Sequence, residues 1–336
     1  MSKVETRTVA ADEADIRLDR WFKRHYPDLS HIHLQKLLRT GQVRVEGKRA
    51  EAGTRLEPGQ SIRVPPIQAA PIPAVSAEGE KPAKAARLAL SEKDAAELRA
   101  RVLYRDADVL VIDKPAGLAV QGGTGTSKHL DAMLDALTFD AEERPRLVHR
   151  LDRDTSGALV LARNVWAAAK LTEMFRGKDV RKIYWAATVG VPKPFQGKID
   201  LALAKHPGSR GERVADDNEP SLRAVTMFNV LEHAGTRAAF VAMWPRTGRT
   251  HQLRVHMAAI GTPILGDGKY AGQDAFLSGS DLPRQTHLHA RRIVLPHPRG
   301  KGVVDATAPL PEHMRKTWDY FGFSANLKDD PFEGVE

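Results

Sequence analysis

The spacing of apolar residues predicts two helices near the start of the chain. Leu18, Trp21 and Phe22 recur at helical intervals, and a second apolar stripe covers residues 34–38. Gly41 follows that stripe at the position where the end of a helix commonly takes a left-handed residue. Each predicted helix therefore has one apolar face, which has to be buried against another element.

Short strands and a linker follow the two helices. Val43 and Val45 alternate with polar residues, and a loop leading into a second alternating stretch occupies residues 56–64. These elements predict a small domain over residues 16–65. Prolines and alanines without a helical or strand period come next, so we predict a linker over residues 66–100.

Beyond the linker the pattern changes to longer apolar runs. The predicted strands cover residues 108–115, 157–162, 182–189, 224–231, 238–244 and 252–255. Helical spacing predicts helices over residues 129–137 and 165–176. Strands and helices do not alternate as a doubly wound parallel sheet requires. We therefore predict an α+β domain over residues 101–325 with a mainly antiparallel central sheet.

The charge balance and the absence of cysteine narrow the range of functions. The chain has 336 residues, with 51 lysines and arginines against 42 aspartates and glutamates, which gives a formal net charge of +9. That excess favours a polyanionic partner, and nucleic acid before an anionic membrane. The lack of cysteine excludes disulfides, thiolate metal sites and cysteine nucleophiles. No apolar segment has the length of a signal peptide or membrane span, so we expect a cytoplasmic protein without a membrane partner.

The segment RPRLVHRLDRDTSG, residues 144–157, concentrates charged groups before a predicted strand. Arginines surround two carboxylates, Asp152 and Asp154. Nearby cations favour the ionised form, so we expect the pKa of these carboxyls to lie below the usual range. An ionised aspartate among cations is either part of a structural ion pair or a nucleophile or base, and the pattern alone leaves both interpretations open.

Two further segments carry candidate functional residues. In RTGRTHQLRVH, residues 246–256, a strand would place Arg254 between apolar neighbours, where it needs a carboxylate partner such as Asp152. The alternative is a basic surface strand that touches phosphate. In RKIYWAATVG, residues 181–190, Tyr184 stands beside basic residues, which suits base stacking, although a tyrosine in a strand also suits the core.

These segments together resemble one enzyme family. HRLDRDTSG, KIYWAATVG, GRTHQLRVH and the tripeptide LHA at residues 288–290 are similar, in order and spacing, to motifs of the bacterial ribosomal large-subunit pseudouridine synthases. The resemblance spans roughly residues 100–323 and is greatest to the type C subgroup. Residues 16–65 resemble the alpha-L RNA-binding module of a small-subunit ribosomal protein, which members of the family often carry in front of the catalytic domain.

The resemblance implies a reaction and a role for several residues. Family members isomerise a uridine within RNA to pseudouridine by breaking the glycosidic bond and forming a carbon–carbon bond, without a cofactor or a metal. Asp152 maps to the catalytic aspartate, Tyr184 to the tyrosine that packs on the uracil, and Arg254 to the arginine of the active-site salt bridge. Arg150 maps to the residue that fills the RNA helix after the target nucleotide flips out.

The resemblance also implies the substrate and the residues that bind it. The expected partner is 23S ribosomal RNA, either free or in an assembling large subunit, and the enzyme is expected to act as a monomer. The residues predicted to contact RNA are Arg150, Arg153, Arg249, Lys36, Arg39, Arg44 and Lys48. The last four crowd one helix and the following hairpin of the N-terminal module.

Two other functions fit parts of the pattern. A non-catalytic RNA-binding ribosome-assembly factor would need only the alpha-L module and the basic loops, but it would not need a carboxylate that faces a polyanion. A hydrolase could use Asp152 and Asp154 as a carboxylate pair, but only one residue separates them and no metal ligands accompany them. The complete set of Asp152, Tyr184 and Arg254 favours the synthase.

Overall fold

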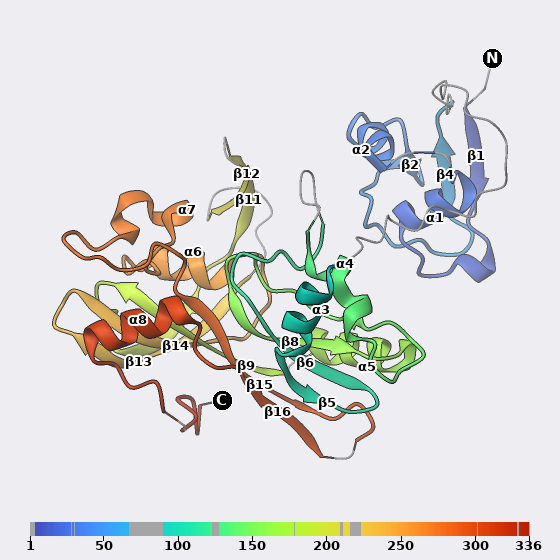
Figure 1. Cartoon of the computed structure of the whole chain (residues 1–336). Coiled ribbons are helices and arrows are strands. Elements are labelled where there is room, and N and C mark those ends of the chain that lie inside the picture. Colours follow the sequence, from blue (N-terminus) through green and yellow to red (C-terminus); the bar gives the residue numbers. More distant parts are fainter. Residues whose placement is uncertain are drawn as a thin grey trace. The chain divides into compact units, whose positions relative to one another are not determined.

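The computed structural model of the chain divides into two compact units, residues 1–83 and residues 84–336 (Figure 1). The structure describes residues 4–27, 29, 31–66, 90–122, 128–177, 179–208, 211–215, 223–300, 302–327 and 329–335. Most of the predicted linker, residues 67–89, lies outside the described residues. Each unit has its own sheet and its own apolar core.

The first unit combines a small antiparallel sheet with two helices. Its strand order is β1-β4-β2-β3, with β1 Glu5–Thr8, β2 Arg44–Val45, β3 Lys48–Arg49 and β4 Ser61–Val64. The helical elements are η1 Ala11–Glu13, α1 Leu18–His25 and α2 His31–Arg39. Trp21 and Phe22 of α1 are buried in one cluster with Val43 and Ile62. The helical spacing predicted from the sequence is confirmed, and Gly41 has a positive φ of 70°.

A ten-stranded sheet forms the centre of the second unit (Figure 1). Its order is β10-β13-β14-β9-β15-β8-β6-β5, with β16 beside β15 and β7 beside β8. The strands are β5 Val102–Arg105, β6 Val109–Lys114, β7 Arg146–Leu147, β8 Ser156–Ala162, β9 Arg181–Val189, β10 Gln196–Asp200, β13 Val225–Ala234, β14 Ala238–Pro245, β15 Leu288–Pro296 and β16 Val303–Thr307. Among these described strands, β8 and β15 run parallel and the other neighbours are antiparallel. The predicted α+β class with a mainly antiparallel sheet is confirmed.

Helices and a separate hairpin surround this sheet. The helices are α3 Glu92–Arg99, α4 Leu130–Met133, α5 Val165–Arg176, α6 Gln252–Ala259, α7 Gly268–Ala271 and α8 Glu312–Phe321, and the 3₁₀ turns are η2 Leu134–Leu137 and η3 Gly272–Ala275. The hairpin consists of β11 Ala204–Gly208 and β12 Gly211–Ala215. The helices predicted over 129–137 and 165–176 correspond to α4 with η2 and to α5. Within the described ranges, no helix has the length and apolar character that crossing a membrane requires.

The period of two along the central strands explains why apolar layers cover both faces of the sheet. In β6, Val109 and Val111 join the cluster that contains the buried face of α5, whereas Leu110 and Ile112 join the cluster of α3 and η2. Strands β8 and β14 are buried at every position. Helices α6 and α8 contribute to separate clusters that contain alternate residues of β14. The second unit is therefore a sheet with helices on both faces.

The predicted linker extends too far toward the C-terminus. Residues 92–99 form helix α3, in which Ala95 and Leu98 are buried. Ser91 caps the helix by accepting a hydrogen bond from the Asp94 N–H at 3.1 Å. Since the helix presents so narrow an apolar face, its sequence carries little of the periodic signal from which helices are predicted.

The predicted strand over residues 252–255 is also wrong. These residues form the first turn of helix α6, and the helix is buried from Gln252 through Met257. Polar and apolar residues alternate here because both kinds are buried, whereas in a half-exposed strand the polar ones would face solvent. His251, which precedes the helix, has the left-handed conformation φ 53°, ψ 19° and turns the chain into it.

Candidate functional site

A cavity of about 370 Å³ opens in the second unit. Its walls come from the loop between β7 and β8, from α5, from β9 and from the loop that precedes α6. Asp152, Tyr184 and His251 line it from three separate segments. Cavities of roughly 300–1,000 Å³ commonly hold small ligands, so a single nucleotide is of suitable size.

The loop that carries Asp152 is fixed on both sides of that residue. Before it, Nε2 of His149 accepts a hydrogen bond from the Val160 N–H at 2.8 Å, and the His149 ring stacks on Phe175 with centroids 4.1 Å apart. Burial lowers the pKa of His149 to about 3, which keeps the ring neutral and able to accept. After it, the Thr155 N–H donates to the Asp152 carbonyl at 3.2 Å. The loop therefore holds Asp152 in a defined position.

Two of the sequence motifs meet where this loop enters β8. Ser156 is the register partner of His289 on β15, and their side-chain atoms Oγ and Nδ1 lie 2.9 Å apart. The next residue, Gly157, has a φ of 109°, and a Cβ atom there would collide with the backbone of Ala290. The close approach of the two parallel strands thus explains why glycine follows the Thr-Ser pair.

Lys114 fastens the same loop from the other side. This lysine, at the end of β6, is fully buried, and its ammonium donates to the carbonyls of Pro115, Leu118 and Arg153 at 2.9, 2.8 and 3.1 Å. Burial lowers the pKa of Lys114 to about 8. Since Arg153 directly follows Asp152, the contact to its carbonyl brings a cation close to the carboxylate without pairing the two.

Asp152 keeps a free carboxylate in the cavity. Its side chain is 17% exposed, and the described residues place no lysine or arginine in ion-pair contact with it. Burial raises the pKa of Asp152, although the charges of Arg254, Arg150 and Lys114 act in the opposite direction. The predicted lowering of this pKa is wrong, because the cations act from a distance that does not offset burial.

Arg254 forms its ion pair with a different carboxylate. Its Nε and Nη2 atoms donate to Oδ2 and Oδ1 of Asp267 at 2.7 and 2.6 Å, and both residues are buried. The ring of Tyr270 lies over the guanidinium at 5.2 Å. Asp152 is therefore not the ion-pair partner that the sequence suggested. Arg254 does not line the cavity and acts on Asp152 only through its charge.

Tyr184 and Trp185 have different environments although they are adjacent on β9. Tyr184 lines the cavity, and burial, followed by the charge of Asp152, raises its pKa well above the usual value, so the hydroxyl stays protonated. Trp185 packs edge-on against Phe240 at 4.8 Å and lies under the guanidinium of Arg291 at 4.3 Å. Tyr184 is thus placed to contact a ligand, whereas Trp185 belongs to the core.

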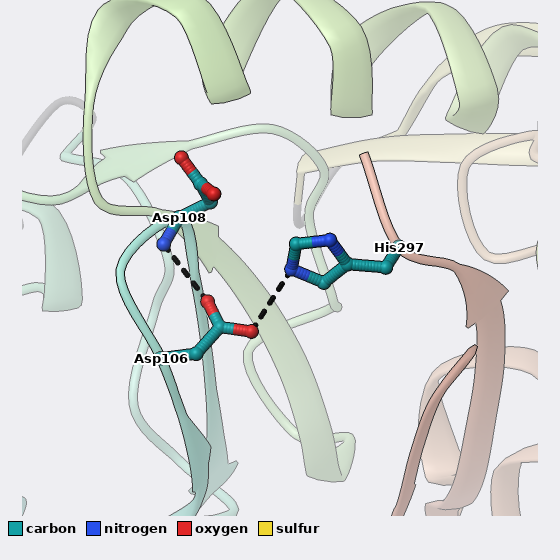
Figure 2. Close-up of side chains that lie close together, drawn as sticks. All are labelled: Asp106, Asp108 and His297. Atoms are coloured by element: carbon teal, nitrogen blue, oxygen red, sulfur yellow. Dashed lines mark hydrogen bonds and ion pairs between the residues drawn. The ribbon is translucent and has the colours of Figure 1, made fainter. Parts of the chain in front are cut away.

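A second group of titratable side chains converges elsewhere, where Asp106 and Asp108 approach His297 (Figure 2). The possible ligand atoms lie within 4.8 Å of one another. Hydrogen bonds already occupy them, since Asp106 accepts from the Asp108 N–H at 2.8 Å and shares a hydrogen bond of 2.9 Å with Nε2 of His297. Arg299 pairs with Asp108 at 2.5 and 2.9 Å. Because this guanidinium would oppose a cation, the group ties two turns of the sheet together and does not suit a metal.

Comparisons with known proteins identify the family. A family model described as RNA pseudouridylate synthase matches residues 108–259. Ribosomal large subunit pseudouridine synthase C of Rickettsia bellii is 34% identical to the chain over 305 residues, which cover 89% of this chain and 96% of that protein. The protein of the same name from Vibrio vulnificus is 34% identical over 317 residues, with 94% and 96% covered. The chain belongs to the RNA pseudouridylate synthase family.

Solved structures of the family agree with this assignment. Human RNA Pseudouridylate Synthase Domain Containing 4 superposes with a TM-score of 0.56 at 28% identity and covers 68% of this chain and 95% of that chain. The human Domain Containing 1 protein gives a TM-score of 0.51 at 30% identity, with 62% and 83% covered. The protein is an RNA pseudouridine synthase, an isomerase that acts on uridine in RNA.

Three arginines of the synthase motifs differ in their relation to the cavity. Arg150 and Arg249 are exposed and line its mouth. Arg153 is exposed as well, but its Nε donates to the Gly117 carbonyl at 3.1 Å and it does not line the cavity. Arg150 and Arg249 therefore line the same cavity as Asp152, and Arg153 is directed to the turn that follows β6.

The basic residues predicted to bind RNA in the first unit lie on its surface. Lys36 and Arg39 are exposed on α2, and Lys48 is exposed on β3. Arg44 on β2 is exposed too, but its guanidinium donates to the carbonyl of Gly41 at 3.2 Å and to that of Gly47 at 3.0 Å. The other three side chains thus extend without a hydrogen bond to any residue that the structure describes, whereas Arg44 also stabilises its own hairpin.

Two cavity residues of the synthase were missed from the sequence. His251 lines the cavity beside Asp152, whereas a strand over its motif would have turned it away from Arg254. Lys182 lines the cavity two residues before Tyr184, and burial lowers the pKa of its ammonium. The period of two along β9 gave a signal for Lys182, since residues i and i+2 of a strand share one face. No comparable signal marks a left-handed histidine before a helix.

Proposed function

We propose that this synthase converts uridines of 23S ribosomal RNA to pseudouridine in the cytoplasm, as a monomer, on free RNA or on an assembling large subunit. The proteins from Rickettsia bellii and Vibrio vulnificus, which match nearly the whole chain, are named for the ribosomal large subunit, and this supports the choice of RNA. The net charge of +9 suits a long RNA substrate.

Asp152 is the proposed catalytic group. The observation that carries this proposal is a carboxylate that lines the cavity and is free of any direct lysine or arginine partner among the described residues. Its oxygens are therefore available to attack the ribose or to remove a ribose proton, and both routes require the ionised form. The charges of Arg254, Arg150 and Lys114 favour that form against the effect of burial.

Tyr184 and Arg150 are the proposed contacts to the target nucleotide and to the RNA it leaves. A stacked uridine hides its ribose, so the nucleotide has to leave the stack before Asp152 can reach it. Tyr184 then packs on the uracil and holds the freed base for reattachment, which avoids the entropy of finding it again. Arg150, exposed at the mouth of the cavity, takes the place of the flipped nucleotide.

The first unit is proposed to act as a second RNA contact. Its elements over residues 16–65 suit the alpha-L module, and Lys36, Arg39, Arg44 and Lys48 would neutralise phosphates there. The catalytic domain, predicted over residues 101–325, carries Asp152, Tyr184 and Arg254. A linker between the two would raise the local concentration of RNA at the active site without taking part in the reaction.

The test is to map pseudouridine across ribosomal RNA from a strain that lacks the gene. We expect specific 23S positions to lose the modification, the wild-type gene to restore them, and Asp152→Asn at equal expression to leave them unmodified. Complete modification of 23S RNA in the deletion strain, with losses in another RNA, would contradict the proposed substrate. Restoration by Asp152→Asn would contradict the proposed role of Asp152 and leave the substrate untouched.

A further inference from the structure

His251 has an unusual backbone for a residue beside the cavity. Its φ of 53° lies in the left-handed region, which is unfavourable for a residue with a Cβ atom. It precedes α6, yet its side chain makes no capping hydrogen bond to that helix. The imidazole instead lines the cavity. The left-handed backbone therefore turns the chain into α6 and leaves the ring in the wall of the cavity.

Both nitrogens of the His251 ring face polar groups. Nε2 lies 3.7 Å from Oδ1 of Asp152, and Nδ1 lies 2.5 Å from the hydroxyl of Tyr270 on α7. The ring therefore stands between α7 and the loop that carries the carboxylate. A distance of 3.7 Å is longer than a hydrogen bond, as is common for catalytic contacts in the absence of substrate. A small movement of either side chain would close it.

The imidazole is neutral in this environment. Burial, followed by the charges of Arg254 and Lys269, lowers the pKa of His251 to about 4. A neutral ring carries one proton, and its position is coupled to the direction of the hydrogen bond with Tyr270. When the Tyr270 hydroxyl donates to Nδ1, the ring proton is on Nε2 and points at the Asp152 carboxylate.

We propose that His251 is a positioning residue for Asp152, whose carboxylate accepts a hydrogen bond from Nε2 of the histidine once the target nucleotide fills the cavity. The proposal rests on the catalytic role of Asp152 proposed above. An N–H donor at this point favours the ionised carboxylate and fixes its orientation toward the ribose. Tyr270 contributes indirectly, because a hydroxyl that donates to Nδ1 leaves the ring proton on Nε2.

Several charged groups act on this pair from neighbouring elements. The titratable and charged groups that face Asp152 and His251 are Arg254 on α6, Asp267 and Lys269 at α7, Arg150 and Asp154 in the loop before β8, Lys114 on β6, Tyr184 on β9 and Tyr270 on α7. A substitution at His251 removes the hydrogen bond between Tyr270 and the ring and leaves the other groups in place. Tyr270→Phe removes the same hydrogen bond while the imidazole remains, so a comparison of the two variants separates the loss of the Nε2 donor from the loss of the Tyr270 contact.

The test compares His251→Phe, His251→Gln and Tyr270→Phe with the wild type in single-turnover pseudouridine formation at saturating enzyme and at several pH values. Phenylalanine keeps a ring without a donor, whereas glutamine can place an amide N–H near the position of Nε2. We expect His251→Phe to slow the saturated rate on the order of 10–100-fold, with RNA affinity within a few-fold. The acidic limb of its pH profile should shift to higher pH. His251→Gln should regain part of the rate, and Tyr270→Phe should show a smaller loss with the same upward movement.

Three outcomes would overturn the proposal. One is a folded His251→Phe enzyme with the rate and acidic limb of the wild type. Another is a loss of rate that is equal in the phenylalanine and glutamine variants and parallels their loss of thermal stability, while the acidic limb of the pH profile stays at the wild-type pH. That result would assign His251 a structural role. The third applies if His251→Phe fails to fold. In that case, a Tyr270→Phe enzyme with the wild-type rate and the wild-type acidic limb of the pH profile contradicts the proposal. Activity in Asp152→Asn would instead contradict the proposed function, so the two failures are distinguishable.

Discussion

Asp267 and Asp152 both lie near the charge of Arg254, and they differ in whether they form an ion pair with it. Asp267 accepts two hydrogen bonds from the guanidinium, at 2.7 and 2.6 Å, and is buried. The charge of Arg254 also acts on Asp152, but the two side chains form no ion pair, and 17% of the Asp152 side chain remains exposed. The Asp267 carboxylate is occupied by its ion pair, whereas the Asp152 carboxylate is available to bind a ligand.

The difference separates a structural ion pair from a reactive carboxylate. Two hydrogen bonds from one guanidinium fix both geometry and charge, which joins α6 to the turn that begins α7. A carboxylate bound in this way has few lone pairs left for a substrate. Asp152 stays available because Arg254 is already held by Asp267 and the cavity keeps the burial of Asp152 incomplete.

The largest effect is expected for Asp152→Asn. The amide cannot act as nucleophile or base, so the saturated rate should fall at least about 10³-fold. RNA affinity should stay within a few-fold, since the cavity keeps its shape. The free energy of unfolding should stay the same or increase. In the wild type the pKa of Asp152 is higher in the folded than in the unfolded state, so the ionised carboxylate destabilises the fold once the pH rises above the unfolded pKa. The neutral amide removes this effect. Single-turnover kinetics and thermal unfolding measure these effects.

Asp154→Asn is the matched control for that variant. Asp154 is exposed, lies two positions further along the same loop and does not line the cavity. Turnover should therefore persist in Asp154→Asn. A loss of activity in Asp154→Asn equal to that in Asp152→Asn would show that the loop, and not the carboxylate of Asp152, limits the reaction.

Asp267→Asn should affect stability most. Removal of the charge leaves Arg254 buried without its partner, and breaking a buried ion pair in this way costs about 3–5 kcal/mol of unfolding free energy. Urea unfolding of the variant against wild type gives this quantity. Equal stability of the two proteins would mean that water hydrogen-bonds to Arg254 in place of Asp267. The distinction between a structural Asp267 and a reactive Asp152 would then be unsupported.

Arg254→Met should slow the reaction by about 10²-fold at saturation. The loss removes the cation that most favours ionised Asp152 and leaves Asp267 unpaired. The kinetic loss should be measured at a temperature where the variant is fully folded. A folded Arg254→Met enzyme with the wild-type rate would mean that the charge of Arg254 does not affect the reaction rate.

The smallest effect on chemistry is expected for deletion of residues 1–90. The cut leaves Ser91, which caps α3, and removes the whole first unit. Apparent RNA affinity should fall, and the dependence of log K on log salt should flatten by about 0.7–0.9 for each phosphate that the first unit no longer neutralises. The saturated rate should change little. A truncated, folded enzyme without activity would mean that both units build the site.

The sequence predicted those elements whose local pattern fits only one kind of structure. The helix with Trp21 and Phe22 follows from its helical period, and the strand of Val109 and Ile112 follows from a short, continuous apolar run that is buried on both faces. The three motifs also directed attention to Asp152 and its cavity. Local pattern was sufficient in these cases, because the helical period and the short apolar run each match one type of element.

Tertiary contacts decided the rest of the site. Helix α6 is buried around most of its surface, so its alternating sequence suggested a strand. The partner of Arg254 is Asp267, which stands 13 residues further on and outside every recognised motif. The raised pKa of Asp152 depends on burial, and burial is a property of the folded chain. None of these features can be derived from spacing along the sequence.

The pH dependence of single-turnover pseudouridine formation, compared between wild type and Arg254→Met, tests most directly whether an unpaired, ionised Asp152 performs the reaction. The rate should rise with pH, because only the ionised carboxylate reacts. The wild-type limb should lie above the ordinary aspartate pKa of about 3.9, and the limb of Arg254→Met should lie higher still, since burial then acts with less opposition. A wild-type limb at or below the ordinary value, or one that is the same in both proteins, would contradict the account.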